Sequence, residues 1–237
     1  MIILKIFAHR GLSSIYPENT IVAFKKALEY KIDGIETDVQ LTKDNKLVIF
    51  HDELLKRTTN KDGFLKDYNL EELEKLNANN GYEGFYKIPT LDEFLNLVKD
   101  EDITINLELK TSVFEYLGIE KMVYDKIKEY KMMDKIIISS FNHNSLLRFR
   151  KLDSNIRIGL LTSDRLIEPI DYIYKYNFNC FHPFFMAFNK DDVIKAHNMN
   201  IDVNVWTVDL DEAYQMCMNM NVDTIMTNCV NKFCDKK

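Results

Sequence analysis

The sequence predicts an α/β protein that folds as a closed (β/α)8 TIM barrel, a single domain over residues 1–237 with a small insertion after the second strand. Two observations predict this fold: β-branched runs alternate with segments of helical periodicity, and eight such runs occur in 237 residues. Alternating strands and helices indicate βαβ units around a parallel sheet, and a closed barrel takes about 250 residues. A doubly wound open sheet is the alternative. It is disfavoured because GLSSIYPEN, which follows the first run, is not a glycine-rich phosphate turn.

The expected strands are runs of β-branched and apolar residues, in chain order Leu4–His9, Gly34–Gln40, Thr104–Leu109, Lys135–Ser140, Arg157–Leu161, Phe178–His182, Asp202–Trp206 and Asp223–Thr227. Most of them are separated by a segment with apolar residues at helical spacing, namely Glu18–Lys31, Leu117–Met132, Asn144–Leu152, Leu166–Tyr176, Lys190–Asn198 and Leu210–Met220. The N-terminal run MIILKIFAHRG contains a lysine and precedes no small-residue cleavage site, so it predicts a first strand and not a signal peptide.

One connection is longer than the others, the segment from 41 to 103 between the second and third strands. It contains a returning apolar run (KLVIFHD), a turn-rich piece (TTNKDGFLKD) and two helical segments (NLEELEKLNA and TLDEFLNLVKD). Extra residues at the carboxyl end of a barrel strand line the mouth where such folds place catalysis. We therefore expect an insertion over about residues 52–88 that covers the substrate site.

Composition narrows the range of partners. The formal net charge is −6 at pH 7, and a mildly acidic protein lacks the basic patch that nucleic acid requires. A small anionic substrate needs only local positive charge. The four cysteines form no CxxC pair, which predicts reduced thiols: Cys180, Cys217, Cys229 and Cys234. Together with the lack of an apolar stretch of about 18 residues, this predicts a cytoplasmic protein without stable membrane insertion. Homo-oligomer formation is left open.

Carboxylates occupy alternate positions near the ends of neighbouring strands. Glu36 and Asp38 are on the second strand, and Glu108 and Lys110 are on the third. Each pair therefore shares one face and points to the carboxyl-end mouth of a barrel. Three carboxylates at one place repel one another unless a cation lies among them. Oxygen ligands indicate a hard divalent cation, Mg²⁺ or Ca²⁺, and not zinc. The alternative is a structural network of ion pairs.

Two histidines end apolar runs that lead to the same mouth, and two cations lie close to them in the predicted barrel. His9 and His51 are the candidate pair for general acid–base catalysis, because imidazole titrates near neutral pH. Arg10 and Lys110 suit a phosphate group, because a guanidinium can donate two parallel hydrogen bonds to phosphate oxygens and an ammonium group supplies a compact positive charge. Asp52 follows His51 directly, and we expect it to orient that imidazole or to cap the following turn.

The other histidines and the single tryptophan have weaker signals. His143 is expected at a helix start or on the surface, and His197 in solvent at the end of a helix. For His182 the sequence allows two locations, the rim of the site or the packed interior. Trp206 ends a strand at the mouth, where we expect an apolar wall for the carbon skeleton of the substrate.

Several spaced motifs, in consistent order from residue 7 to residue 228, resemble the glycerophosphodiester phosphodiesterase family. They are HRG at 9–11, PENT at 17–20, GIETDVQLTKDNKLVIFHD at 34–52, RTTNKDGFLKD at 57–67, IPTLDEFL at 88–95, NLELK at 106–110, SSF at 139–141 and WTV at 206–208. The resemblance implies a compact bacterial cytosolic enzyme. Such an enzyme hydrolyses glycerophosphodiesters, for example glycerophosphocholine or glycerophosphoethanolamine, to sn-glycerol 3-phosphate and an alcohol.

The resemblance also assigns roles to individual residues. It implies one divalent cation held by Glu36, Asp38 and Glu108, and an acid–base pair made by the two histidines of HRG and VIFHD. It implies phosphate binding by Arg10 and Lys110. The long segment after the second strand resembles the family's small insertion, which covers the glycerol side of the site.

Two positions depart from the family pattern. The chain has TVD at 207–209 where the family commonly has TVN, and TNCV at 227–230 where it commonly has a Thr-Asp-x-Pro type ending. Both lie outside the metal and histidine centre, so they concern the rim of the site and not the reaction.

Two rival functions remain at this point. One is a lyase on sphingolipid or lysophospholipid headgroups, which would need an apolar membrane-facing loop and a secretory signal. The other is a catalytically silent barrel that binds a partner, which would lack at least one histidine or carboxylate of the centre. The sequence leaves open the headgroup, the metal, the assignment of acid and base, and whether water or the 2-hydroxyl of glycerol attacks phosphorus.

Overall fold

The eight expected strands form one closed parallel barrel in the structure, a computed structural model that describes residues 3–237. They are β1 (Lys5–His9), β2 (Gly34–Leu41), β4 (Thr104–Leu109), β5 (Ile136–Ser140), β6 (Arg157–Thr162), β7 (Cys180–Pro183), β8 (Asp202–Val205) and β9 (Thr224–Thr227). β1 pairs in parallel with both β2 and β9, which closes the barrel. The predicted fold class is confirmed, although residues 1–2 of the N-terminal run lie outside the described residues.

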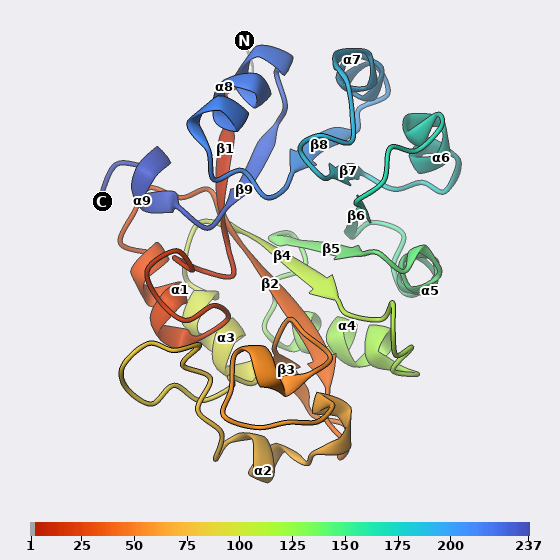
Figure 1. The fold of residues 1–237 in the computed structure, drawn as a ribbon. Coiled ribbons are helices and arrows are strands. Elements are labelled where there is room, and N and C mark those ends of the chain that lie inside the picture. The colour runs from red at the N-terminus through yellow and green to blue at the C-terminus, as the bar shows by residue number, and fades with distance from the viewer. Residues whose placement is uncertain (1–2) are drawn as a thin grey trace.

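The helices follow the strands along the chain and surround the barrel (Figure 1). They are α1 (Ile21–Ala27), α3 (Leu91–Val98), α4 (Ile119–Glu129), α5 (His143–Leu152), α6 (Pro169–Lys175), α7 (Lys190–Asn198), α8 (Asp211–Met220) and α9 (Val230–Phe233). Side-chain caps set several of their starts. At α3, for example, Thr90 accepts from the backbone N–H of Glu93, and the Glu93 carboxylate accepts from that of Thr90.

The two faces of the strands have different chemistry. On β2, Ile35 and Val39 belong to the apolar core shared with the helices, while Glu36 and Asp38 alternate with them and face the barrel interior. The parallel register places Glu36 beside both His9 and Asn106. The register therefore gathers polar side chains from three neighbouring strands at one end of the barrel.

The long connection after β2 folds over a small core of its own. It begins with β3 (Leu47–Ile49), which pairs antiparallel with β2, and continues through η1 (Leu55–Arg57), η2 (Leu65–Asp67) and α2 (Leu70–Leu73) beside the barrel (Figure 1). Its apolar cluster consists of Val48, Phe50, Leu55, Leu65, Leu73, Ala78 and Ile88. The antiparallel return of β3 brings the chain back to the mouth at His51.

Two further expectations concern the cysteines and the membrane. All four cysteines have free thiols, and Cys180 and Cys217 are buried. Within residues 3–237, every helix is too short or too polar to cross a bilayer.

Candidate active site

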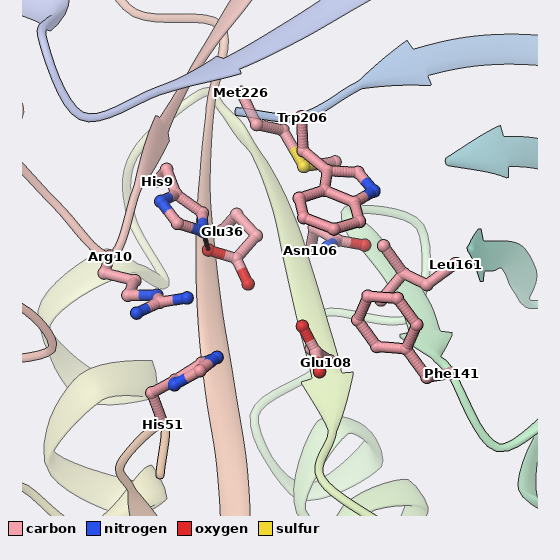
Figure 2. Close-up of a pocket in the computed structure, with 10 residues that line it drawn as sticks. All are labelled: His9, Arg10, Glu36, His51, Asn106, Glu108, Phe141, Leu161, Trp206 and Met226. Atoms are coloured by element: carbon pink, nitrogen blue, oxygen red, sulfur yellow. Dashed lines mark ion pairs between the residues drawn. The ribbon is translucent and has the colours of Figure 1, made fainter. Parts of the chain in front are cut away.

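A cavity of about 160 Å³ opens at the carboxyl ends of the barrel strands. Figure 2 shows the side chains that line it: His9, Arg10, Glu36, His51, Asn106, Glu108, Phe141, Leu161, Trp206 and Met226. Six of the eight residues predicted for the site belong to this lining. The other two, Asp38 and Lys110, lie directly behind it, because Lys110 Nζ is 2.9 Å from Glu108 Oε1 and Arg10 Nε is 3.3 Å from Asp38 Oδ2. The structure therefore brings all eight together.

Three buried carboxylates form the centre of this site. Glu36, Asp38 and Glu108 each offer an oxygen, and these oxygens lie within 4.8 Å of one another. Glu36 Oε2 and Asp38 Oδ1 are buried and have no hydrogen-bond donor among the described residues. Burial without a donor costs free energy unless a cation compensates. The donor set and these unpartnered oxygens fit a hard divalent cation.

The pKa values of Glu36 and Asp38 are shifted in opposite directions. Burial, followed by the charges of Asp38 and Glu108, raises the pKa of Glu36 well above its usual range. Burial alone would also raise the pKa of Asp38, but the positive charges of His51, Arg10 and Lys110 together hold it below its usual range. One site thus contains a carboxyl group that resists ionisation beside one that ionises easily.

Asn19, which sequence reasoning did not single out, fixes Asp38. Its Nδ2 donates to Asp38 Oδ2 at 2.8 Å, and its Oδ1 accepts from Thr37 Oγ1 at 2.8 Å. One oxygen of Asp38 is therefore bound, whereas the other, Oδ1, is buried and has no hydrogen-bond donor among the described residues. The only available signal was its place in the PENT motif.

The HRG turn places Arg10. Gly11 has a φ of +86°, and a Cβ there would lie 2.6 Å from the carbonyl carbon of Ala23, so the turn requires glycine. Arg10 then donates from its NH1 to Glu18 Oε1 at 2.9 Å. Glu18 is a second residue that the sequence reasoning missed.

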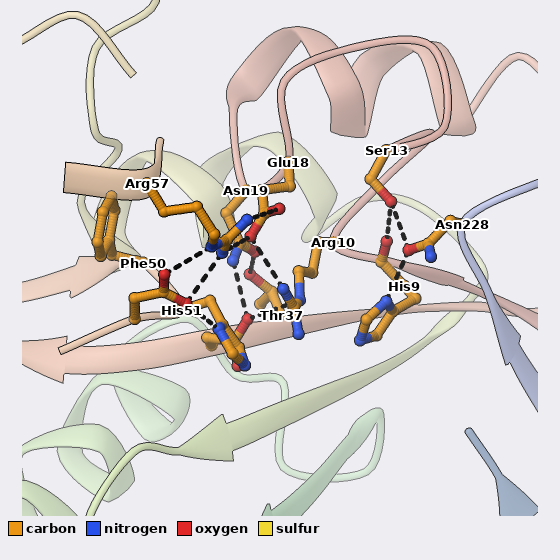
Figure 3. Close-up of polar contacts among 12 residues, drawn as sticks. His9, Arg10, Ser13, Glu18, Asn19, Thr37, Phe50, His51, Arg57 and Asn228 are labelled. Carbon is orange, nitrogen blue, oxygen red and sulfur yellow. Dashed lines mark hydrogen bonds and ion pairs between the residues drawn. The ribbon is translucent and has the colours of Figure 1, made fainter. Parts of the chain in front are cut away.

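A chain of charged side chains links Arg10 to His51 (Figure 3). Arg57 binds both oxygens of Glu18 at 2.7 Å through NH1 and NH2, and it donates from Nε to Asp52 Oδ2 at 2.6 Å. Asp52 Oδ1 lies 2.5 Å from His51 Nδ1. Of the two roles expected for Asp52, this geometry favours orientation of His51.

The loop that carries His51 is anchored by hydrogen bonds from the Gln40 side chain. Its Nε2 lies 2.9, 3.1 and 2.8 Å from the carbonyl oxygens of Phe50, His51 and Asp52. Gln40 is fully buried on β2, so the position of His51 depends directly on the strand that carries Glu36 and Asp38.

His9 is held from the opposite wall. Its Nδ1 lies 2.7 Å from Asn228 Oδ1, and its Nε2 lies 3.7 Å from Glu36 Oε2. Burial, followed by the charge of Arg10, lowers the pKa of His9 to about 4. These surroundings therefore favour a neutral imidazole at this position.

Trp206 lies where an apolar wall was expected. It lines the cavity, packs edge-on against Phe141 with ring centroids 5.4 Å apart, and donates from Nε1 to the carbonyl oxygen of His182 at 2.9 Å. His182 itself is fully buried in the barrel, where its Nε2 lies 2.9 Å from Asn204 Nδ2. It belongs to the packed interior and not to the rim.

The two remaining histidines have structural partners. His143 begins α5 as expected, and its Nε2 lies 3.0 Å from the carbonyl oxygen of Leu161. The expectation that His197 is solvated is wrong, because its Nε2 lies 2.9 Å from Asp223 Oδ2 in a half-buried pair. The sequence did not reveal this partner, since Asp223 is 26 residues away, immediately before β9.

Known proteins share this fold and much of this sequence. A model of the glycerophosphoryl diester phosphodiesterase family matches residues 9–232. A glycerophosphodiester phosphodiesterase of Caldanaerobacter subterraneus is 42% identical over 226 residues, which cover 94% of this chain and 93% of that protein. One from Bacillus altitudinis is 40% identical and covers 94% of both.

Solved structures of phosphodiesterases have the same fold. The glycerophosphodiester phosphodiesterase of Thermotoga maritima superposes with a TM-score of 0.80 at 29% identity, covering 98% of both chains. An Oleispira antarctica phosphodiesterase, solved in complex with the product sn-glycerol-3-phosphate, superposes with a TM-score of 0.87 at 27% identity and covers 96% of this chain and 94% of that one. The chain therefore belongs to the glycerophosphoryl diester phosphodiesterase family.

Proposed function

We propose that this protein hydrolyses glycerophosphodiesters, such as glycerophosphocholine or glycerophosphoethanolamine, to sn-glycerol 3-phosphate and an alcohol. The observation that carries the proposal is the meeting of three buried carboxylates, two histidines and an arginine at one cavity. Family membership and the product named for the Oleispira antarctica relative support the substrate class. The partner is thus a small anionic molecule, and we propose a cytoplasmic location.

The proposed metal ligands are Glu36, Asp38 and Glu108, which would hold one Mg²⁺ or Ca²⁺. When bound, such an ion neutralises phosphodiester charge and stabilises the extra charge of the transition state. Arg10 lines the cavity and contributes a second fixed positive charge to the phosphate oxygens. Lys110 lies against Glu108 and Asp38, so it balances the carboxylates as well as the phosphate.

The two histidines would exchange protons with the substrate from opposite sides. His51 is bound by the Asp52 carboxylate, which stabilises a charged imidazolium, whereas His9 is buried against a neutral amide. We therefore assign His51 as the general acid that protonates the leaving alkoxide. His9 is then the general base that takes a proton from the nucleophile.

The apolar wall and the insertion would fit the rest of the substrate. Trp206, Phe141 and Leu161 line one side of the cavity and suit carbon–hydrogen surface. We propose that residues 52–88 form the cover on the glycerol side, as part of one barrel domain.

A product assay tests this function. Metal-stripped protein is incubated with glycerophosphocholine, glycerophosphoethanolamine and lysophosphatidylcholine, with EDTA, Mg²⁺ or Ca²⁺, and both glycerol 3-phosphate and the released choline or ethanolamine are measured. We expect cation-dependent release of glycerol 3-phosphate from the first two substrates. Release of headgroup only from the lysophospholipid would favour the lyase, and no turnover of any substrate would favour a silent barrel.

A carboxylate variant tests the metal centre. Glu36→Gln should abolish the activity that Mg²⁺ or Ca²⁺ restores after EDTA. Glu120→Gln is the matched control, because Glu120 is also a buried glutamate but binds Ser145 and Arg148 away from the cavity. Full activity of Glu36→Gln, or of the wild type in EDTA, would show that the carboxylates serve another purpose.

A further inference from the structure

The two positions that depart from the family pattern, Asp209 and Asn228, are hydrogen-bonded to each other. Asn228 Nδ2 donates to Asp209 Oδ2 at 2.7 Å, and the backbone N–H of Asn228 donates to Asp209 Oδ1 at 2.8 Å. Thr227 Oγ1 also donates to Asp209 Oδ1, at 3.0 Å. Three donors from the end of β9 therefore fix this carboxylate, which follows β8 in the chain.

The carboxylate determines which way the Asn228 amide points. An ionised carboxylate only accepts hydrogen bonds, so the NH₂ end of the amide must face Asp209. Asn228 Oδ1 then faces the other way, where it lies 2.7 Å from His9 Nδ1 and 2.7 Å from Ser13 Oγ (Figure 3). A flipped amide would place its oxygen against the carboxylate, with repulsion in place of a hydrogen bond.

The amide in turn determines which nitrogen of His9 carries hydrogen. Asn228 Oδ1 has no proton to give, so the 2.7 Å contact requires a hydrogen on His9 Nδ1. This holds whether the imidazole is neutral or charged. The other ring nitrogen, Nε2, is directed toward Glu36 in the cavity (Figure 2).

We propose that Asp209 and Asn228 are positioning residues for His9: Asp209 fixes the Asn228 amide, and the amide keeps His9 in the Nδ1–H form with Nε2 turned to the substrate. Neither residue needs to touch the reacting atoms. The inference rests on the proposed function only for the statement that His9 exchanges a proton with the substrate.

The arrangement depends on one carboxylate and one amide, with an acceptor oxygen next to His9. Two carboxylates or two amides would break this arrangement.

The first test measures the proton position directly. Protein labelled with ¹⁵N-histidine is examined by long-range ¹H–¹⁵N correlation, with and without Mg²⁺, and the His9 signals are identified by their loss in His9→Gln. We expect His9 to carry hydrogen on Nδ1 in the wild type and to become a mixture of tautomers in Asp209→Asn. Asp211→Asn is the matched control, since Asp211 is the first residue of α8, two positions after Asp209, and pairs with Lys232 at the surface. An Nε2–H tautomer in the wild type, or no change in Asp209→Asn, would overturn the proposal.

The second test uses activity and an exchanged pair. Asp209→Asn and Asn228→Asp should each lower kcat about 10- to 100-fold with little change in KM, as loss of outer-shell partners commonly does. The double variant D209N/N228D again pairs one carboxylate with one amide and keeps an acceptor beside His9, so it should regain part of the kcat that either single variant loses. Full recovery is not expected, because the new carboxylate at position 228 would place a negative charge beside His9 and favour imidazolium. Losses that simply add in the double variant would overturn the proposal. Absence of activity in the wild type would instead refute the proposed function, and the tautomer measurement would still decide the role of the pair.

Discussion

His9 and His51 are bound through the same ring nitrogen by partners of different charge. His9 Nδ1 lies 2.7 Å from the neutral amide of Asn228, while His51 Nδ1 lies 2.5 Å from the Asp52 carboxylate. The His9 side chain is 12% exposed and that of His51 is 28% exposed. Both end apolar runs in the sequence, yet His9 ends strand β1 of the barrel, whereas His51 follows β3 at the start of the insertion.

This difference teaches that similar sequence contexts can place two imidazoles beside hydrogen-bond partners of different charge. A carboxylate partner favours imidazolium, whereas burial beside a neutral partner favours imidazole. Two titratable groups held in such different surroundings are what a reaction with one proton acceptor and one proton donor requires.

The largest expected effect separates the two histidines by leaving group. On glycerophosphocholine, His9→Ala and His51→Ala should each lower kcat by about 10²- to 10⁴-fold, the usual contribution of a general acid or base. A glycerol phosphodiester of p-nitrophenol needs no protonation of its leaving group, so His51→Ala should recover most of its rate on this substrate and His9→Ala should not. Recovery by His9→Ala alone would reverse the assignment.

A smaller effect is expected when only the charge beside His51 is removed. A hydrogen bond to an ionised group contributes about 1.5–3 kcal/mol, so Asp52→Asn should lower kcat about 10- to 100-fold. The measurement is steady-state kinetics on glycerophosphocholine. Asp62→Asn is the control, because Asp62 is an exposed aspartate of the same insertion whose carboxylate pairs with Lys56. Equal rates for the two variants would remove Asp52 from the mechanism.

A still smaller effect should follow from cutting the link between the two sides of the site. Arg57→Ala removes the fork that joins Asp52 to Glu18, and the arginine is 45% exposed, so we expect about a tenfold loss of kcat/KM or less. Its neighbour Lys56 forms an exposed pair with Asp62, and Lys56→Ala should leave kcat/KM unchanged. A loss of the same size in both variants would indicate a general effect on the insertion.

The smallest effect concerns the carboxylate centre that both histidines share. Because the pKa of Glu36 is raised in the folded, metal-free protein, folding is favoured while Glu36 is protonated, and this stability is lost as pH rises through its folded pKa. A bound cation compensates for ionised carboxylates, so EDTA should lower Tm by about 5 °C at pH 8 and by less at pH 5. Calorimetry of Glu36→Gln should show no such pH-dependent difference, and an unchanged difference would exclude Glu36 as its cause.

Much of the centre could be predicted because it depends on short-range spacing. Residues two apart on a strand share a face, so Glu36 and Asp38 had to point together, and Glu108 with Lys110 likewise. The position of His182 could not be predicted from such spacing. Its ring lies over Gly159 on the neighbouring strand, where an added Cβ would come within 2.4 Å, and that contact depends on register between strands.

The sequence by itself determined the alternation of strands and helices, hence the barrel, and it determined which residues could meet at the barrel mouth. Only the tertiary structure decided which hydrogen-bond partner each of them has. His9 and Asn228 are 219 residues apart in the chain, and Arg57 reaches back 39 residues to Glu18. Periodicity fixes the face on which a side chain lies, whereas a hydrogen bond also requires a register, a rotamer and a donor opposite an acceptor, which exist only after the barrel has closed.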